Sequence, residues 1–445
     1  MRAQEGAHPV VVVSAMSRVT DALLASVQRA ADGQPCASAH DLDEHFERHL
    51  KVAHALLAPP SAARIESLVE SAHAQITELL RMVAAQPTSR PLLQDVIASY
   101  GERLSASLLA AVLCESGLPA HYVDARRCIV TDECHGGATP YAAATERRTR
   151  AELEPLLAAA KIPVLGGFIA AANSGETTTL GRGGSDYTAS LVGAALSARE
   201  IQIWTDVPGI LTADPRLVTR ARTISRLSYA EAAELAYFGA KVLHPKTIQP
   251  AVEQSIPVRI CNSHAPEEAG TLVCSEPEIA PRTVKAIAHR TGITTLQVIS
   301  ARMLGAHGFL RALFEIFDRH RTVVDVITTS EVSVSLSLDD VSELPNILRE
   351  VRQLGAVEVE ADRTLICIVG EGLRGTPGIA ARAFNTISDI NISLISQGAS
   401  SVNLTFVIDE ARGTEAVRRL HEAFFERAND QTPETVLLES KGAAY

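Results

Sequence analysis

The chain has 445 residues, of which 46% are hydrophobic and 21% charged, and its mean hydropathy is +0.10. This length exceeds that of a usual single domain, so we expect two or three globular units, and the composition excludes a mainly disordered chain. The 41 Lys and Arg against 52 Asp and Glu give a net charge of −11, which disfavours nucleic acid as a partner.

The seven cysteines are odd in number and have no CxxC spacing, which indicates reduced thiols rather than a disulfide framework. A zinc site at Cys128, Cys134 and His135 would need a fourth ligand and regular pair spacing, so we expect no protein-ligated metal. No run of 18 apolar residues and no signal-peptide pattern is present. We therefore expect a cytoplasmic protein without membrane contact.

Short β-branched runs alternate with longer helical patterns over the first 260 residues. This alternation predicts βαβ units around a mostly parallel sheet that is covered by helices. Strands are predicted at 10–13, 162–165, 201–205 and 257–261, and helices at 41–58, 61–85 and 92–116.

The polar, proline-containing stretch from Ser275 to Arg282 predicts a linker. We expect a first domain over 1–275, a linker over 276–283 and a second region over 284–445. Adding 70 to a position in this second region finds its counterpart without a gap, as for Gly308 and Gly378 or Phe314 and Phe384. Each copy reads as a strand, a Gly-containing turn, a helix and two strands, which predicts ferredoxin-like α+β modules at about 294–362 and 364–430.

The segment from Thr177 to Asp186 holds three threonines, three glycines and Arg182 just before an apolar helix. Glycines let the backbone approach an anion, a helix N-terminus offers free N–H groups, and Arg182 adds a bidentate donor. We interpret this segment as an anion site. The alternative is a glycine-rich turn in which Ser185 or Asp186 caps the helix.

Two further loops follow predicted strands or precede a helix. Thr205 and Asp206 end the strand at 201–205, and Arg216 follows in the same loop as a candidate cation for nucleotide phosphates. The alternative for this loop is a Pro-Gly turn. Lys241 precedes a helix that starts with Pro245, where a solvated lysine is the ordinary case and a phosphate contact is the functional interpretation.

Two polar side chains of the predicted helices can contact a small ligand. Glu102 can accept a hydrogen bond from an α-ammonium group, and Thr20 can donate one to a carboxylate. The alternative readings are an exposed helix glutamate and a threonine in the first turn of a helix.

Five segments in this order, together with the tandem repeat, resemble the aspartate kinase family over about residues 9 to 430: 11–17, 101–105, 177–186, 204–210 and 240–245. The resemblance implies an α/β amino-acid-kinase domain, with a mostly parallel sheet in a three-layer αβα arrangement, followed by two ferredoxin-like ACT domains. It also implies an ATP-dependent phosphotransferase that converts L-aspartate to 4-phospho-L-aspartate, the first step towards lysine, threonine and methionine.

The resemblance assigns roles to matching residues. It implies that aspartate is held by Thr20, Glu102, Arg182, Gly183, Gly184 and Ser185, and that Arg182, Asp186 and Lys241 take part in catalysis. ATP with Mg²⁺ is implied at Thr205, Asp206, Leu211, Arg216, Lys241 and Val242. A carboxylate acceptor is already ionised at pH 7, so no general base is required.

The sequence departs from the family at its start. The family begins with a strand that ends in Lys-Phe-Gly-Gly, whose lysine neutralises the transferring phosphoryl group, and no such segment precedes Val10. We interpret the given sequence as an aspartate kinase with an incomplete N-terminus and expect impaired activity, because losing such a contact costs a hundred- to a thousandfold in rate. Adding an upstream Lys-Phe-Gly-Gly segment should restore it.

The first repeat copy resembles the lysine-inhibited branch of the family. The resemblance implies an allosteric lysine site at Met303, Gly308, Phe309, Leu310, Val324, Asp325, Ser330 and Glu331. Asp325 and Glu331 can bind an ammonium group, whereas plain core packing is the alternative for the apolar members. Pairing between ACT units predicts a homodimer. Two other functions stay open: another amino-acid kinase, and a catalytically impaired amino-acid sensor.

Overall fold

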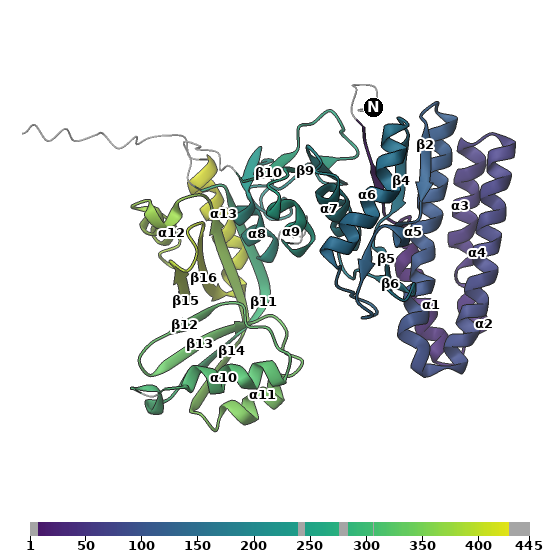
Figure 1. Ribbon diagram of the computed structural model, residues 1–445. Coiled ribbons are helices and arrows are strands. Elements are labelled where there is room, and N and C mark those ends of the chain that lie inside the picture. The colour runs from purple at the N-terminus through teal and green to yellow at the C-terminus, as the bar shows by residue number, and fades with distance from the viewer. Residues whose placement is uncertain (1–7, 239–244, 276–283, 306, 427–445) are drawn as a thin grey trace, which may run out of the picture. The chain divides into compact units, whose positions relative to one another are not determined.

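The computed structural model describes residues 8–238, 245–275, 284–305 and 307–426, and the predicted linker at 276–283 lies outside them. The chain divides into two compact units, one made of residues 1–207 and 243–276 and the other of 208–242 and 277–445 (Figure 1). The segment 208–242, which precedes the predicted linker, therefore folds with the C-terminal region.

The first unit alternates strands and helices. Its strands are β1 (Val11–Val13), β2 (Ala120–Val123), β3 (Val130–Thr131), β4 (Ile162–Gly166), β5 (Ile169–Ala172), β6 (Thr177–Thr179), β7 (Ile201–Thr205), β9 (Val258–Asn262) and β10 (Thr271–Cys274). Its helices are α1 (Val19–Ala31), α2 (Pro35–His40), α3 (Asp43–Leu56), α4 (Pro59–Ala85), α5 (Arg90–Glu115), α6 (Ala142–Ala158), α7 (Gly184–Ala195) and α9 (Pro245–Glu253). The four strands and three helices predicted from the sequence are confirmed, with shifts of one or two residues at their ends.

Strand β4 is central in the first ladder, because β1 and β2 both pair with it in parallel. The pairs β3–β5 and β7–β9 are also parallel, whereas β5–β6 and β9–β10 are antiparallel. Helix α5 packs on β1, β2 and β4, while α6 and α7 contact the strands from the other side (Figure 1). Mostly parallel pairing covered by helices is what the alternating pattern predicts.

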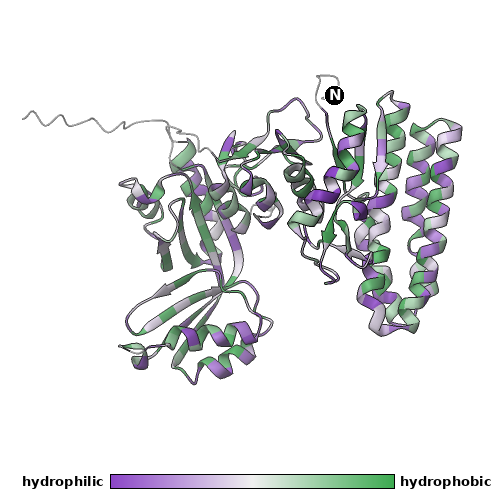
Figure 2. Cartoon of the chain, viewed as in Figure 1, coloured by the Kyte–Doolittle hydropathy of each residue, from purple (hydrophilic) through white to green (hydrophobic). Residues whose placement is uncertain are grey.

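Helices α1 to α5 share a separate apolar core. Its fully buried members include Val27, Ile76, Leu80 and Ile97, and hydrophilic and hydrophobic residues alternate along these helices in Figure 2. The stretch 87–115, which contains α5, is long and apolar enough to cross a membrane. However, 61% of its apolar window is buried inside the protein, so α5 is a core helix of this unit.

The second unit is an α+β structure with one six-stranded sheet. Its elements are β8 (Arg226–Ser228), α8 (Tyr229–Tyr237), β11 (Ala286–Ile299), α10 (Phe309–Arg319), β12 (Ile327–Thr329), β13 (Ser333–Leu338), α11 (Leu344–Val351), β14 (Ala356–Val369), α12 (Ile379–Thr386), β15 (Ile392–Gln397), β16 (Asn403–Asp409) and α13 (Gly413–His421). The strand order of the sheet is β12-β13-β11-β14-β16-β15.

The repeat read from the sequence is visible in this unit. Gly308 and Gly378 occupy the N-cap positions of α10 and α12 with φ of 85° and 84°, a left-handed conformation that favours glycine. Each copy then continues into two antiparallel strands, β12–β13 and β15–β16. The predicted order of strand, glycine turn, helix and two strands is therefore confirmed.

Strands β11 and β14 run through both modules. The first part of β11, residues 286–290, pairs with 365–369 of β14, and its second part, 293–299, pairs with 356–363. The register shifts between Arg290 and Thr295, where the sheet passes from one module to the other. Each module thus completes its four-stranded sheet with one half of both long strands.

The segment 208–242 is joined to the second module. Ala213 and Val218 belong to the same apolar core as Phe406 and Leu420. The backbone N–H of Ile287 donates to the carbonyl oxygen of Thr212 at 2.8 Å. These contacts explain why a segment that precedes the linker belongs to the C-terminal unit.

Candidate functional site

A cavity of about 540 Å³ lies in the first unit. It is lined by Ser14, Thr20, Asp21, Leu24, Gln94, Asp95, Ala98, Glu102, Gly136, Phe168, Thr179, Gly181, Arg182, Gly183, Gly184, Ser185 and Asp186. All residues assigned to aspartate from the sequence resemblance are in this set. The structure therefore brings together α1, α5 and the start of α7, whose cavity residues lie up to 166 positions apart in the chain, from Thr20 to Asp186.

Glu102 is the buried carboxyl group of this cavity. Its side chain comes from the middle of α5 and is 3% exposed, so the exposed-glutamate alternative is wrong. One carboxyl oxygen, Oε1, accepts hydrogen bonds from the Ala15 N–H at 3.3 Å and from Thr20 Oγ1 at 3.4 Å. The other, Oε2, is buried without a hydrogen-bond partner among the described residues.

Burial raises the pKa of Glu102 to about 7, although the hydrogen bonds from Ala15 and Thr20 act in the opposite direction. A carboxylate in this position gains most from a cationic partner, because a nearby positive charge offsets the cost of desolvation. The unpaired Oε2 therefore marks a place for a positively charged ligand group such as an ammonium.

The loop before α7 supplies donors to the same cavity. Gly181 and Gly183 have φ of 74° and 72°, and Gly183 is the N-cap of α7 with no side-chain cap. The alternative in which Ser185 or Asp186 caps this helix is therefore wrong. Arg182, between the two glycines, is exposed and has no hydrogen-bond or ion-pair partner among the described residues, so its guanidinium group is available to an anion.

Asp186 lies in the first turn of α7 and also lines the cavity. Burial raises the pKa of its carboxyl group to about 6. A carboxylate near a helix N-terminus is favoured by the helix dipole, but this one has no hydrogen-bond partner in the described part of the chain. The cavity thus contains two carboxyl groups whose pKa is raised by burial, Glu102 and Asp186, and one available arginine.

Two glycines that the sequence analysis did not single out allow these elements to approach. A Cβ on Gly166 would lie 3.1 Å from the carbonyl oxygen of Glu102, and one on Gly167 would lie 2.6 Å from the Cα of Ser185. These glycines end β4 and are held between α5 and α7. The available signal was a Gly-Gly pair directly after a predicted strand, where open α/β sheets bind ligands.

Asp95, which was not predicted from the sequence, lines the cavity from α5 and is 1% exposed. Its carboxylate accepts hydrogen bonds from His135, Gly136 and Thr179. The signal that could have found it is its spacing of seven residues from Glu102, which places both on one face of a helix.

The predicted nucleotide contacts are distributed over both units. Thr205 and Asp206 lie at the end of β7, where the Thr205 hydroxyl donates to the Asp206 carboxylate at 3.2 Å. Leu211 and Arg216 belong to the second unit, where Arg216 is 86% exposed and forms a bidentate pair with Asp214. Lys241 and Val242 lie outside the described residues.

The predicted effector residues lie in the first ACT-like module. Met303, Phe309 and Val324 pack against its apolar core, as the packing alternative predicts, whereas Leu310 is 41% exposed. Gly308 caps α10, Ser330 interacts with Ser333, and Glu331 is exposed.

Asp325 is the buried charged member of this group, with a side chain that is 2% exposed. Its Oδ1 accepts a hydrogen bond from the Tyr237 hydroxyl, whereas Oδ2 is buried without a partner. Burial raises the pKa of the Asp325 carboxyl group, and the Tyr237 hydrogen bond acts against this shift. Arg290 Nη1 lies 3.8 Å from Oδ1, so Asp325 also has a cationic neighbour within the protein.

None of the seven cysteines forms a disulfide, and four of them are buried. Burial raises the pKa of the Cys128 thiol to about 12, which leaves it protonated and a poor metal ligand. Among the described residues, no group of three or more His, Cys, Asp and Glu side chains is arranged to hold a metal ion.

Comparison with known proteins identifies the class. Residues 2–262 match the amino acid kinase family, and residues 366–424 match the ACT domain. The fold and the cavity between α1, α5 and α7 therefore define an amino acid kinase with a C-terminal ACT region.

Individual relatives show which family of amino acid kinases the chain resembles. The chain is 38% identical over 427 residues to the lysine-sensitive aspartokinase 3 of Escherichia coli (strain K12), covering 94% of this chain and 92% of the relative. It is similar to the crystal structure of E. coli aspartokinase III with aspartate and ADP, with a TM-score of 0.80, 38% identity and coverage of 94% and 93%. The complex of that enzyme with lysine and aspartate gives a TM-score of 0.77, 39% identity and the same coverage. The chain belongs to the aspartokinase family.

Proposed function

We propose that the cavity binds L-aspartate and that the protein transfers the γ-phosphoryl group of ATP to the substrate's β-carboxylate. The observation that carries this proposal is the pairing, in one cavity, of the unpartnered Glu102 Oε2 with the available Arg182. An amino acid with two carboxylates and one ammonium group is complementary to this pair. The E. coli relative was crystallised with aspartate and ADP, which supports the same substrate class.

The chain's own residues perform positioning and charge neutralisation. Glu102 would accept from the ammonium group, with Thr20 orienting the Glu102 carboxylate. Arg182 and the first turn of α7 would hold a substrate carboxylate. The β-carboxylate is ionised at pH 7, so one of its oxygens attacks the γ-phosphorus while the bond to ADP breaks, and no proton is transferred. Catalysis then depends on aligning two anions.

The nucleotide would be held by Thr205, Asp206, Leu211, Arg216, Lys241 and Val242. Mg²⁺ is usually bound through phosphates and one or two carboxylates, and Asp186, an unpartnered carboxyl in the cavity, fits this donor set. When bound, the ion would neutralise phosphate charge. Asp186 would then be ionised, because a nearby cation opposes the shift that burial causes in its pKa.

The proposal is tested by combining the protein with aspartate, ATP and Mg²⁺ and trapping the acyl phosphate as a hydroxamate. We expect a product with aspartate and none with glutamate or N-acetylglutamate. Arg182→Ala and Glu102→Gln should each weaken aspartate binding in calorimetry, whereas Arg147→Ala, on the exposed side of α6, should not. Aspartate binding without any acyl phosphate would favour the sensor function instead.

We further propose that lysine inhibits the enzyme by binding at Asp325. The buried, unpartnered Oδ2 of Asp325 is suited to an ammonium group, and the E. coli relative is named lysine-sensitive. Calorimetry with lysine should show binding that Asp325→Asn removes. Asp340→Asn, an exposed change in the same module, should leave it intact. Equal binding of lysine by the wild type and Asp325→Asn would contradict this site.

The proposal also covers the oligomeric state of the protein and its cellular compartment. Strand β12 is an edge of the sheet. Its first residue, Ile327, is 41% exposed, and Val323 just before the strand is 64% exposed. An exposed strand edge with apolar neighbours favours pairing with a second copy, which supports a homodimer through the ACT region. Light scattering should give the dimer mass, and Ile327→Lys should give the monomer. The lack of disulfides among the seven cysteines supports a reducing compartment such as the cytoplasm.

A further inference from the structure

Asp95 is a buried carboxylate of the cavity for which the reaction has no direct use. It lies on α5 seven residues before Glu102, so two helical turns place both side chains on one face. Its residue is 1% exposed, and it lines the cavity together with Thr179 and Gly136. A buried carboxylate is retained only where donors compensate for its desolvation.

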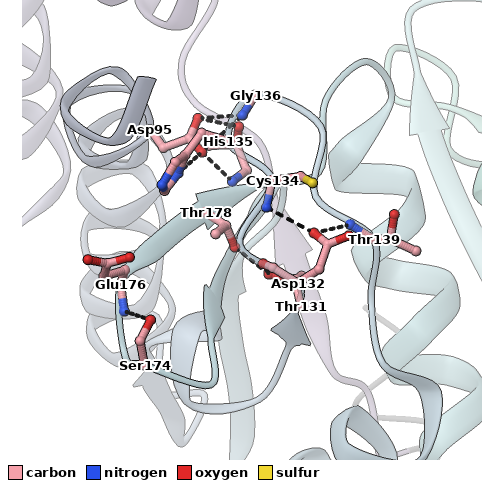
Figure 3. Close-up of polar contacts among 11 residues, drawn as sticks. Asp95, Thr131, Asp132, Cys134, His135, Gly136, Thr139, Ser174, Glu176 and Thr178 are labelled. Carbon is pink, nitrogen blue, oxygen red and sulfur yellow. Dashed lines mark hydrogen bonds and ion pairs between the residues drawn. The ribbon is translucent and has the colours of Figure 1, made fainter. Parts of the chain in front are cut away.

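Four donors from two separate segments compensate Asp95. The Thr179 hydroxyl donates to Oδ1 at 2.7 Å, and the Thr179 N–H donates to Oδ2 at 3.2 Å. The Gly136 N–H lies 3.0 Å from Oδ2 and 3.1 Å from Oδ1, and His135 Nδ1 lies 3.0 Å from Oδ2. Figure 3 shows Asp95 facing His135 and Gly136.

Both segments lead to the anion-binding loop. Thr179 ends β6 and precedes Arg182 by three residues. The connection 132–139, which contains Gly136, is joined to the same strand end, because the Ala138 N–H donates to the Thr179 carbonyl oxygen at 2.8 Å. The backbone of Gly136 also lies directly behind Gly181, where an added Cβ would be 3.3 Å from the Gly136 oxygen.

We propose that Asp95 is a positioning residue for the substrate. It fixes the end of β6 and the connection 132–139 to α5, and thereby sets the separation between Arg182 and Glu102. This inference rests on the proposed function, in which Arg182 binds a carboxylate and Glu102 binds the ammonium group of one aspartate molecule. The helix that carries the ammonium acceptor is thus tied directly to the loop that carries the carboxylate donor.

A carboxylate is required for this role. Asp95 is surrounded by donors, and an ionised carboxyl group accepts at both oxygens, whereas an asparagine side chain would direct its own N–H groups at one set of these donors. Asp95→Asn conserves shape but leaves a buried donor without an acceptor. The end of β6 would then move relative to α5, and a misplacement of about 1 Å can cost a hundredfold in productive alignment.

The test compares four variants by calorimetry with aspartate and, separately, with ADP and Mg²⁺. Asp95→Asn removes the clamp, and Thr179→Val removes only the hydroxyl donor, which Thr179→Ser retains. Asp132→Asn is the matched control. Asp132 also accepts two N–H groups within the connection 132–139, from Cys134 at 3.2 Å and Thr139 at 3.0 Å, but no hydrogen bond from it to α5 is present among the described residues (Figure 3).

We expect Asp95→Asn to raise the dissociation constant for aspartate about ten- to a hundredfold, with ADP binding changed less than about twofold. Thr179→Val should give a smaller increase that Thr179→Ser largely reverses, and Asp132→Asn should stay within about twofold of the wild type. This separation of substrate from nucleotide affinity is not expected from a general loss of stability.

The inference is overturned if folded Asp95→Asn binds aspartate like the wild type, if Asp132→Asn weakens aspartate binding equally, or if ADP and aspartate affinities fall together. If Asp95→Asn does not fold, the difference between Thr179→Val and Thr179→Ser decides, and equal affinities there count against the clamp. A wild-type protein that binds no aspartate would instead overturn the proposed function, and the positioning role with it.

Discussion

Single buried carboxyl groups define the chemistry of the first unit. Glu102 and Asp95 come from one helix and are both almost fully buried, yet their surroundings differ. Asp95 is saturated with donors, whereas Glu102 keeps one oxygen without a partner. The donor-rich carboxylate is suited to holding the protein together, and the donor-poor one is suited to receiving a charged ligand.

The free-state protonation of Glu102 predicts a pH-dependent stability. Burial raises its pKa from 4.5 to about 7, so the folded state holds the proton more tightly than the unfolded chain. The resulting stabilisation is complete below about pH 4.5 and is lost as the pH rises to about 7. Glu102→Gln does not titrate, and it should therefore gain up to about 3 kcal/mol of unfolding free energy over the wild type between pH 4.5 and 8.

Urea denaturation of both proteins at several pH values measures this difference. Glu176→Gln, at an exposed position of the same unit, should differ from the wild type by the same amount at every pH. Parallel stability curves for Glu102→Gln and the wild type would show that Glu102 is not protonated in the free cavity.

At the scale of elements, the cavity depends on how closely α5, β4 and α7 approach. The glycine pair 166–167 removes side chains where both helices meet the end of the strand. Gly167 faces the backbone of Ser185, and Gly166 faces that of Glu102. The elements that carry the proposed substrate residues thus approach one another at glycine backbone, where no side chain separates them.

Gly167→Ala should therefore cost about 1–3 kcal/mol of stability and weaken aspartate binding, because its Cβ would lie 2.6 Å from the Cα of Ser185. Gly137→Ala is the control, since no atom lies within 4 Å of its added Cβ. Thermal unfolding and aspartate calorimetry measure both effects. Equal melting temperatures for the two variants would contradict the close packing.

The second unit has a comparable buried contact between α8 and the sheet region. Lys285 Nζ lies 3.1 Å from Glu231 Oε2, and their side chains are 7% and 0% exposed. Glu231 also forms a capping box with Ser228 at the start of α8. The pair thus attaches α8 to the chain just before β11.

Lys285→Met should lower the unfolding free energy by about 3–5 kcal/mol, because it leaves the Glu231 carboxylate buried without its cation. The double variant Lys285→Met with Glu231→Gln should recover part of this loss. Arg311→Met removes the exposed pair with Glu315 and should cost less than about 1 kcal/mol. Equal losses of unfolding free energy for Lys285→Met and Arg311→Met would show that the buried pair contributes no more to stability than an exposed pair does.

At the scale of the whole molecule, two of the predicted nucleotide residues, Leu211 and Arg216, belong to the same folding unit as the predicted effector residues. Leu211 and Arg216 lie in the segment 208–242, which also contains α8. The last residue of α8 is Tyr237, whose hydroxyl donates to Asp325. Arg290 reinforces the link by donating to the Tyr237 carbonyl oxygen at 2.9 Å. An effector that binds Asp325 would therefore contact a carboxylate that already accepts a hydrogen bond from Tyr237 of α8.

Tyr237→Phe should separate lysine binding from lysine inhibition. The change leaves Asp325 free to bind an ammonium group but removes the hydrogen bond that connects it to α8. We expect the lysine dissociation constant to stay the same or fall, while the lysine concentration for half inhibition rises several-fold. Tyr141→Phe, at an exposed position of the first unit, should change neither. Parallel changes in both quantities for Tyr237→Phe would contradict this coupling.

The sequence predicts features whose signal is local. The strands and helices of the first unit, the glycines at 308 and 378, and the loop before α7 each follow from a short run of residues. Asp95 and Gly167 were missed because their partners, Thr179 and Ser185, lie 84 and 18 positions away, so the contacts that these two residues make cannot be found from a short run of residues. The alternative in which Ser185 or Asp186 caps α7 is wrong, because the N-cap of this helix is Gly183 in a left-handed conformation, without a side-chain cap.

Because both modules share strands β11 and β14, the tandem repeat does not consist of two independent domains. In chain order, residues 286–290 form a strand of the second module. The whole first module follows, and the remaining strands of the second module come after it. A protein shortened after residue 362 would keep the first module's four strands but leave residues 286–290 without their neighbours on β14. Gene fusions or truncations that separate the two copies would therefore divide one continuous six-stranded sheet.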